Sequence, residues 1–141
     1  MDLYTRSQWA LTIVRVLLGG IFVLHGSQKM LGLFGGPGMA GFANWLFTTY
    51  AIPLYIGYAA AVAEFVGGGL LLLGICTQVG AVLVIGIMAG AIYLVHLPHG
   101  FFVQNGGYEY SLTLLILAVA LIIGGPGYFA LWDKKFFNYL F

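Results

Sequence analysis

Charged residues are scarce in this chain. Five lysines and arginines and four aspartates and glutamates occur among 141 residues, and the formal net charge is +1. Soluble domains have about a quarter charged residues, so this composition excludes an ordinary water-facing globule. The small net charge and the absence of a basic run also argue against a nucleic-acid partner.

Cysteine is nearly absent as well. Cys76 is the only thiol, which excludes an internal disulfide, a CxxC redox pair and a cysteine-built metal cluster. Apolar sequence dominates instead, because 62% of the residues are hydrophobic and the mean hydropathy is +1.02. We therefore expect a single integral membrane domain over residues 1–141, with the lipid bilayer as its partner.

Four segments are long and apolar enough to cross a bilayer as helices, which takes about 20 residues. They cover residues 9–31, 53–75, 79–97 and 109–125. The connection between the second and third segments is only long enough to join antiparallel neighbours. The predicted fold is therefore all-α, an antiparallel bundle of four transmembrane helices.

The first long loop, residues 32–52, contains its own helical pattern. Apolar and aromatic residues recur there at helical spacing, at Met39, Phe42, Trp45, Leu46 and Thr49. This pattern indicates a short helix that lies in the membrane interface.

Basic residues predict the orientation of the bundle. Arg6, Lys134 and Lys135 lie on one side of the predicted spans and Lys29 lies on the other. Cytoplasmic segments of membrane proteins contain an excess of lysine and arginine. We therefore expect both termini in the cytoplasm and the two long loops outside, in the cell's inner (cytoplasmic) membrane.

Small residues are expected where membrane helices touch, because lipid provides no hydrophobic reward for helix association. They recur at Gly19 and Gly26, at Ala59, Ala63 and Gly67, and at Gly86 and Gly90. This spacing predicts tight packing of the bundle without specifying the pairs, and a homo-oligomer stays open.

Six ionisable side chains in or beside the spans form the candidate ligand-binding set: His25, Lys29, Glu64, His96, His99 and Glu109. An ionisable group in lipid is unfavourable, and it usually pairs or faces a cavity. Helical periodicity turns His25 and Lys29 to one face of the first span, and antiparallel threading brings most of the others toward the outer side. We predict one shared polar pocket near the outer face. The alternative is that each group caps its own helix or contacts headgroups.

Arg15 and Glu64 are predicted to form a structural ion pair. At a rise of 1.5 Å per residue, the two side chains reach a similar depth in their spans. A buried charge without a partner is strongly destabilising, which favours pairing. The alternative is that Arg15 extends toward cytoplasmic headgroups while Glu64 is neutral.

Histidines and carboxylates in a membrane pocket suit three ligand types: a quinone headgroup, a bis-histidine haem, and a zinc or iron ion. Haem would need His25 opposite His96 or His99, and a metal would need His96, His99 and Glu109. The spacing demands neither arrangement, so no metal site is predicted.

Aromatic side chains at the outer ends could receive a quinone ring, although an interfacial belt needs the same residues. They are Phe34, Phe42, Trp45, Phe101 and Phe102. A quinone therefore fits the available groups best.

The order of short, glycine-rich motifs over the whole bundle resembles the DoxX family. The motifs are His25-Gly26 with Lys29 and Gly32, Gly41-Phe42, Pro53 leading to Glu64 with Gly67-Gly68, Gly74, Gly106-Gly107-Tyr108-Glu109, and Gly125-Pro126-Gly127. The family often continues with a Ser-x-Asp ending. Here Tyr128 to Asp133 contain no serine, so any role of that serine is absent.

The resemblance implies a small four-helix membrane protein associated with redox metabolism. Related proteins include the membrane part of thiosulfate:quinone oxidoreductase, so it implies a subunit that binds a quinone or similar small molecule and supports a redox protein partner. Thiosulfate chemistry is not carried over, because Cys76 lies on the wrong side for the predicted pocket. The competing class is a noncatalytic scaffold or assembly subunit, in which the polar residues only hold the bundle together.

Overall fold

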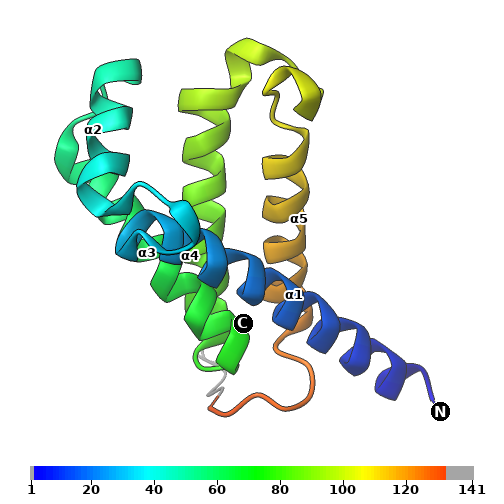
Figure 1. Ribbon diagram of the computed structural model, residues 1–141. Coiled ribbons are helices and arrows are strands. Elements are labelled where there is room, and N and C mark those ends of the chain that lie inside the picture. Colours follow the sequence, from blue (N-terminus) through cyan, green and yellow to red (C-terminus); the bar gives the residue numbers. More distant parts are fainter. Residues whose placement is uncertain (1, 133–141) are drawn as a thin grey trace.

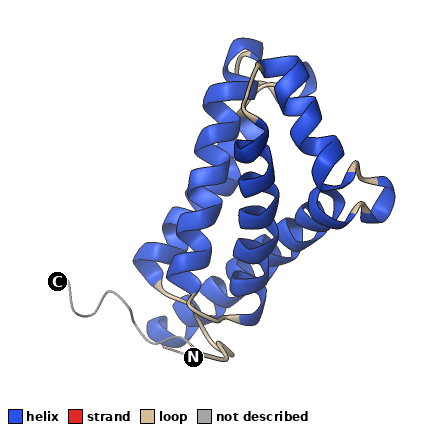
Figure 2. Ribbon diagram, turned by 90° about the vertical axis from the view of Figure 1, so that its left-hand side faces the viewer, coloured by secondary structure: helices blue, strands red, loops and turns tan. Residues whose placement is uncertain are grey.

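The computed structural model describes residues 2–132, and that part of the chain is helical without a strand (Figure 2). The main helices are α1 (Leu3–Leu31), α2 (Gly38–Tyr50), α3 (Leu54–Leu73), α4 (Thr77–Ala91) and α5 (Glu109–Gly124). The shorter turns are η1 (Leu33–Gly35), the π-helix η2 (Ile92–His96) that continues α4, η3 (Leu97–His99) and η4 (Val103–Asn105). The all-α prediction is confirmed.

Three stretches are long and apolar enough to cross a membrane. They are Leu3–Leu31, Leu54–Leu73 and the continuous stretch Thr77–His99, and they coincide with the first three predicted spans. The fourth predicted span coincides with α5, but its 16 residues are fewer than the roughly 20 that a span usually needs. The chain is therefore a multi-pass membrane protein, and the fourth crossing stays a prediction.

Glycines let α1 and α3 pack closely and antiparallel. A Cβ atom on Gly26 would lie 2.6 Å from the Cα of Phe65, and one on Gly68 would lie 2.6 Å from the backbone nitrogen of Val23. Distances this short leave no room for a side chain, so both positions require glycine. The predicted close-packing role of Gly26 is confirmed.

The buried core lies where α1 and α3 meet the neighbouring pair α4 and α5, which run side by side in Figure 1. Its residues are Leu18, Phe22, Leu71, Ala81, Val84, Met88, Leu114, Ala118 and Leu121. Of the five main helices, only α2 contributes no residue to this core.

Helix α2 covers the first half of α3. A Cβ atom on Gly57 of α3 would lie 2.7 Å from the Cα of Ala43 in α2, so the two backbones are in close contact. The helix predicted in the first long loop is thus present. Its place in the membrane interface stays a prediction.

Different elements lie at the two ends of the molecule. Figure 1 shows the N-terminus, the α3–α4 turn and the segment after α5 toward one end, and α2 and the loop before α5 toward the other. This is the arrangement that antiparallel threading predicts. Lys134 and Lys135, which contribute to the predicted orientation, lie outside the described residues, and the side of the membrane that each end faces stays a prediction.

Candidate functional site

The predicted Arg15–Glu64 ion pair is wrong. Arg15 is 1% exposed, and its guanidinium donates to backbone carbonyls of Leu71, Leu72, Pro126 and Tyr128 at 2.7 to 3.2 Å. Carbonyls at the C-terminal end of a helix have a partial negative charge, so the end of α3 is a favourable place for a cation.

The register between α1 and α3 explains the difference. Gly19 lies against Leu72 and Gly26 lies against Phe65, so the antiparallel pair places Lys29, and not Arg15, level with Glu64. Arg15 instead joins α1 to the end of α3 and to the Gly125–Tyr128 segment. It is a structural clamp at the end of the molecule that contains the α3–α4 turn and the segment after α5.

Glu64 forms its ion pair with Lys29. The Nζ of Lys29 lies 2.6 Å from Oε2 of Glu64, and the two side chains are 27% and 3% exposed. The same ammonium lies 5.0 Å from the centroid of the Phe42 ring, within the range of a cation–π interaction. This partly buried pair joins α1 to the middle of α3.

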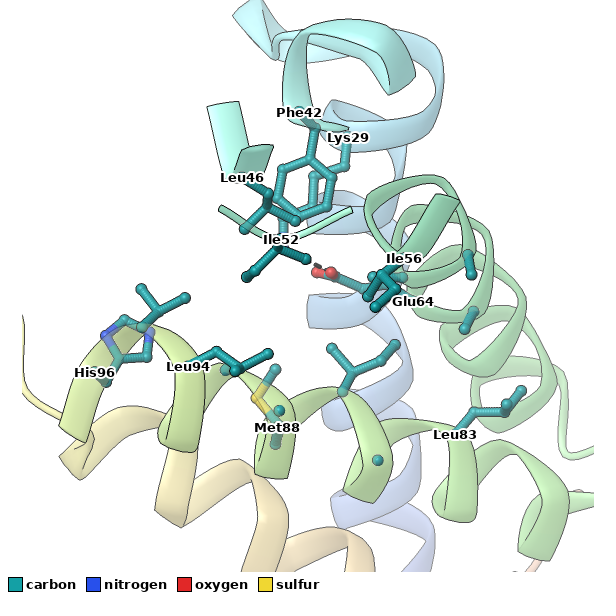
Figure 3. Close-up of a pocket in the computed structure, with 18 of the residues that line it drawn as sticks. Lys29, Phe42, Leu46, Ile52, Ile56, Glu64, Leu83, Met88, Leu94 and His96 are labelled. Atoms are coloured by element: carbon teal, nitrogen blue, oxygen red, sulfur yellow. Dashed lines mark hydrogen bonds and ion pairs between the residues drawn. The ribbon is translucent and has the colours of Figure 1, made fainter. Parts of the chain in front are cut away.

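A large apolar cavity of about 540 Å³, which we call the first cavity, lies beside this pair. Figure 3 shows Phe42, Leu46 and Ile52 on one side of it and Leu83, Met88, Leu94 and His96 along α4 and η2 on the other. Its polar groups come from Lys29, Glu64 and His96. Size and composition match small-molecule sites, which are mostly apolar clefts of about 300–1,000 Å³ with a few placed polar groups.

Small residues form much of the wall between α3 and α4. The lining includes Ala59, Ala60, Ala63, Gly86, Gly90 and Ala91. A Cβ atom on Gly86 or Gly90 would meet no atom within 4 Å. The close helix contact predicted at Gly86 and Gly90 is therefore absent, and these glycines leave space for the cavity instead.

A second cavity of about 260 Å³ lies on the other side of the ion pair. Its lining is Ile21, Phe22, His25, Lys29, Glu64, Met88, Ala91, His96, Tyr110, Ser111 and Leu114. Four of the six predicted site residues, His25, Lys29, Glu64 and His96, thus line one cavity.

The other two predicted site residues lie elsewhere. His99 lines neither cavity, and its Nδ1 donates to the carbonyl of Val95 at 3.0 Å. Glu109 also lines neither cavity. Its Oε2 accepts a hydrogen bond from the backbone N–H of Val103 at 3.0 Å. Both side chains order the loop before α5, as the alternative interpretation of local capping expects.

The histidines that line the second cavity share one geometry. Nδ1 of His25 lies 2.9 Å from the carbonyl of Ile21, and Nδ1 of His96 lies 2.7 Å from the carbonyl of Gly106. Since a carbonyl only accepts, Nδ1 is the protonated nitrogen in each ring. Nε2 is left to accept from a ligand or to bind a second proton.

The π-helix η2 positions His96. A π-helical turn inserts an extra residue into a helix and is often found at functional sites. Helical periodicity placed His25 and Lys29 on one face of α1, and both line the second cavity although His25 is exposed. No sequence signal predicts the π-helical turn. Tyr110 and Ser111, which also line the second cavity, were missed because the prediction considered only histidine, lysine and carboxylate side chains.

Of the aromatic side chains expected around a quinone ring, Phe42 and Trp45 line the first cavity. Phe34, Phe101 and Phe102 line neither cavity. Among the described residues, no group of three histidine, cysteine, aspartate or glutamate side chains has the geometry of a metal site.

The comparisons with known proteins agree with this architecture. The DoxX family model matches residues 10–97, a range that contains His25, Lys29, Glu64 and His96. No solved structure matches the chain.

Two curated relatives cover most of the chain. It is 30% identical to a Bacillus subtilis protein named "Putative oxidoreductase CatD", over 84% of this chain and 81% of the relative. It is 33% identical to an uncharacterized protein of Haemophilus influenzae, over 91% of each. The match to the family model spans more than half of the sequence, and the chain therefore belongs to the DoxX family of membrane proteins.

Proposed function

We propose that this protein is a redox-associated membrane subunit that binds a quinone, or a similar lipophilic molecule with a hydrogen-bonding headgroup, in the first cavity. The observation behind the proposal is the position of the buried Lys29–Glu64 pair in the wall of a cavity that is otherwise almost wholly apolar. A site of this kind suits a ligand with a long apolar part and a few oxygens.

The polar groups of the cavity can recognise a quinone headgroup. The ammonium of Lys29 donates hydrogen bonds and stabilises negative charge on an oxygen, and Nε2 of His96 accepts a hydrogen bond from a hydroxyl. Phe42 and Trp45 stack 6.2 Å apart, centroid to centroid, at the same wall. Aromatic surfaces of this kind favour a flat ring.

Haem and metal ligands are less well supported by the same geometry. His99 and Glu109 lie outside both cavities, so the proposed metal set of His96, His99 and Glu109 does not surround a common space. A bis-histidine haem between His25 and His96 would need far more room than the second cavity offers beside its other lining groups.

The redox association rests on the family and on the name of the Bacillus subtilis relative. Cys76 lines neither cavity, so the thiol of this chain would not react with the bound molecule. A protein partner would exchange electrons with that molecule. We further propose that α5 completes a fourth crossing and that the termini are cytoplasmic, as the distribution of basic residues predicts.

A scaffold remains the second candidate, and one observation favours it. The open wall around Gly86 and Gly90 has the small residues that membrane helices use to pack. A helix from a partner or a second copy could occupy the space that we assign to a small molecule.

Filling the first cavity tests the proposed function. In a Trp9→Phe, Trp132→Phe background, Trp45 is the remaining tryptophan and lines the cavity. A short-chain quinone should quench its fluorescence saturably. Gly86→Leu with Gly90→Leu should weaken binding by at least about tenfold, equivalent to 1.4 kcal/mol, because the new side chains occupy the cavity.

The matched control is Gly20→Leu with Gly69→Leu. A Cβ atom at either position would also meet no atom within 4 Å, but neither glycine lines a cavity. The affinity for the quinone should therefore not change. Linear, unsaturable quenching in all variants would refute the quinone site. Loss of a co-purifying protein or of a dimer in the filled variant alone would favour the scaffold.

A further inference from the structure

The Lys29–Glu64 pair forms part of the partition between the two cavities. The two cavities have five lining residues in common: Lys29, Glu64, Met88, Ala91 and His96. Glu64 is therefore accessible from the apolar first cavity and from the second cavity, although its side chain is only 3% exposed.

The second cavity is lined by a hydroxyl that has no hydrogen-bond partner among the described residues. Ser111 is 6% exposed and lines this cavity, and its Oγ makes no hydrogen bond to any described residue. A serine in a helix commonly bonds to a carbonyl of the preceding turn, as Thr113 does to Glu109 at 2.9 Å. A hydroxyl inside a largely buried residue that lacks such a bond is available to water or a ligand in the cavity that it lines.

The size and lining of the second cavity suit water. Its volume of about 260 Å³ exceeds several times the roughly 30 Å³ that a water molecule occupies in the liquid. The other titratable groups of the lining are Lys29, which is paired with Glu64, and His25 from α1, His96 from η2 and Tyr110 from α5. Helix α4 contributes only Met88 and Ala91. Buried waters need two to four polar partners, which these titratable groups and Ser111 supply.

We propose that the second cavity is a water-filled chamber through which Glu64 exchanges protons with the aqueous phase, at the end of the molecule where α1 ends and α5 begins. The proposal rests on the proposed function, because the proton comes from or goes to a molecule bound in the first cavity. The ligand class is then a hydroxyl-bearing one, such as a hydroquinone.

The proton transfer changes no oxidation state, so it needs no electron acceptor. The O–H bond of the bound hydroquinone breaks, its proton forms a new O–H bond on the Glu64 carboxylate, and the electron pair stays on the ligand oxygen. The resulting oxyanion lies beside the Lys29 ammonium, which is no longer neutralised by Glu64. Glu64 then transfers the proton to water in the second cavity, and Nε2 of His25 can accept it on the way out.

Thiol labelling tests the hydration of the chamber without any quinone. In a Cys76→Ser background, Ser111→Cys should react rapidly with 2-aminoethyl methanethiosulfonate, since only a thiolate reacts and a thiolate needs water. The control is Ala118→Cys, which lies on the same helix in the core at 0% exposure. It should react at least about a hundredfold more slowly, because the reagent then depends on rare local opening.

Equal, slow labelling of the Ser111→Cys and Ala118→Cys variants would overturn the proposal. If Ser111→Cys does not fold, as judged by size-exclusion chromatography, His25→Cys reports from the α1 wall of the same cavity. Slow labelling there overturns the proposal equally.

A pH jump tests the proton step. With a short-chain hydroquinone bound, Trp45 fluorescence should respond within the mixing time, and the dimethyl ether of the same compound should give no response. Ser111→Leu, which displaces water, should lose the fast phase. An unchanged fast phase in Ser111→Leu overturns the proton route. Rapid thiol labelling without any hydroquinone binding instead refutes the proposed function and its proton step, and the hydrated chamber stands.

Discussion

Arg15 and Glu64 are both almost fully buried, and the structure stabilises them in different ways. The guanidinium of Arg15 donates to backbone carbonyls of α3 and of the segment after α5, which cannot be titrated. Glu64 instead depends on one side chain, Lys29. An arginine stays charged at any ordinary pH, whereas lysine and glutamate can each become neutral. The first arrangement suits a structural role and the second suits a site that reacts to a ligand.

Removing Lys29 should therefore destabilise the protein through Glu64. We expect Lys29→Met to lower the free energy of unfolding by about 3 kcal/mol, the low end of the range for one partner of a buried pair, since Lys29 is partly exposed. Adding Glu64→Gln should recover part of the loss. Thermal unfolding in detergent of the two single variants and the double variant measures this coupling.

Arg6→Met is the matched control, because Arg6 is an exposed cation on the same helix. It should unfold like the parent. A Lys29→Met protein that also unfolds like the parent would show that the ion pair adds nothing to stability.

From the sequence we predicted a basic partner for Glu64, but the partner is Lys29 and not Arg15. Hydropathy and charge indicate which side chains need compensation in lipid. They do not indicate the register of two helices, which here follows from close contacts such as Gly26 against Phe65. His99 and Glu109 were misplaced for a related reason, since local hydrogen bonds in the loop before α5 compensate them.

At the scale of elements, the same residue type has opposite roles in two helix pairs. Gly26 brings α1 and α3 into backbone contact, whereas Gly86 and Gly90 on α4 face open space and line the first cavity. The spacing of small residues predicts both patterns equally well. Only the packing of α2 on α3, which holds Phe42 and Leu46 over the gap, distinguishes them.

Alanine substitutions should separate these roles on a single helix. Gly26→Ala places a methyl group against the Phe65 backbone and should destabilise the fold by about 1–3 kcal/mol, as overpacking does. Gly20→Ala meets no atom within 4 Å and should be neutral or stabilising by up to about 1 kcal/mol, because alanine favours a helix. Equal melting temperatures for the two variants in detergent would contradict the described α1–α3 contact.

Most of the helices were predictable from the sequence, because each apolar run is long enough to indicate a membrane-spanning helix. The helix in the first long loop was predictable from spacing alone, within a residue or two of α2 (Gly38–Tyr50). The apolar first cavity was not predictable, because its volume is the space that neighbouring helices leave unfilled, and no single segment of sequence determines that space.

At the scale of the whole molecule, structural and candidate ligand-binding features occupy different ends. The Arg15 clamp joins α1, α3 and the segment after α5 at the end that contains the α3–α4 turn. The Lys29–Glu64 pair and both cavities lie toward the end with α2. A change at the ligand site can therefore leave the clamp intact, which makes binding and stability separable by experiment.

Native mass spectrometry of protein released gently from its own membrane tests the ligand site most directly. We expect the wild-type protein to retain a neutral lipophilic molecule that extraction identifies as a quinone or a compound of similar chemistry. Gly86→Leu with Gly90→Leu should lose that molecule, and Gly20→Leu with Gly69→Leu should keep it. Phospholipid as the sole bound species in the wild type, or an adduct that persists in the filled variant, would contradict the assignment of the first cavity as a ligand site.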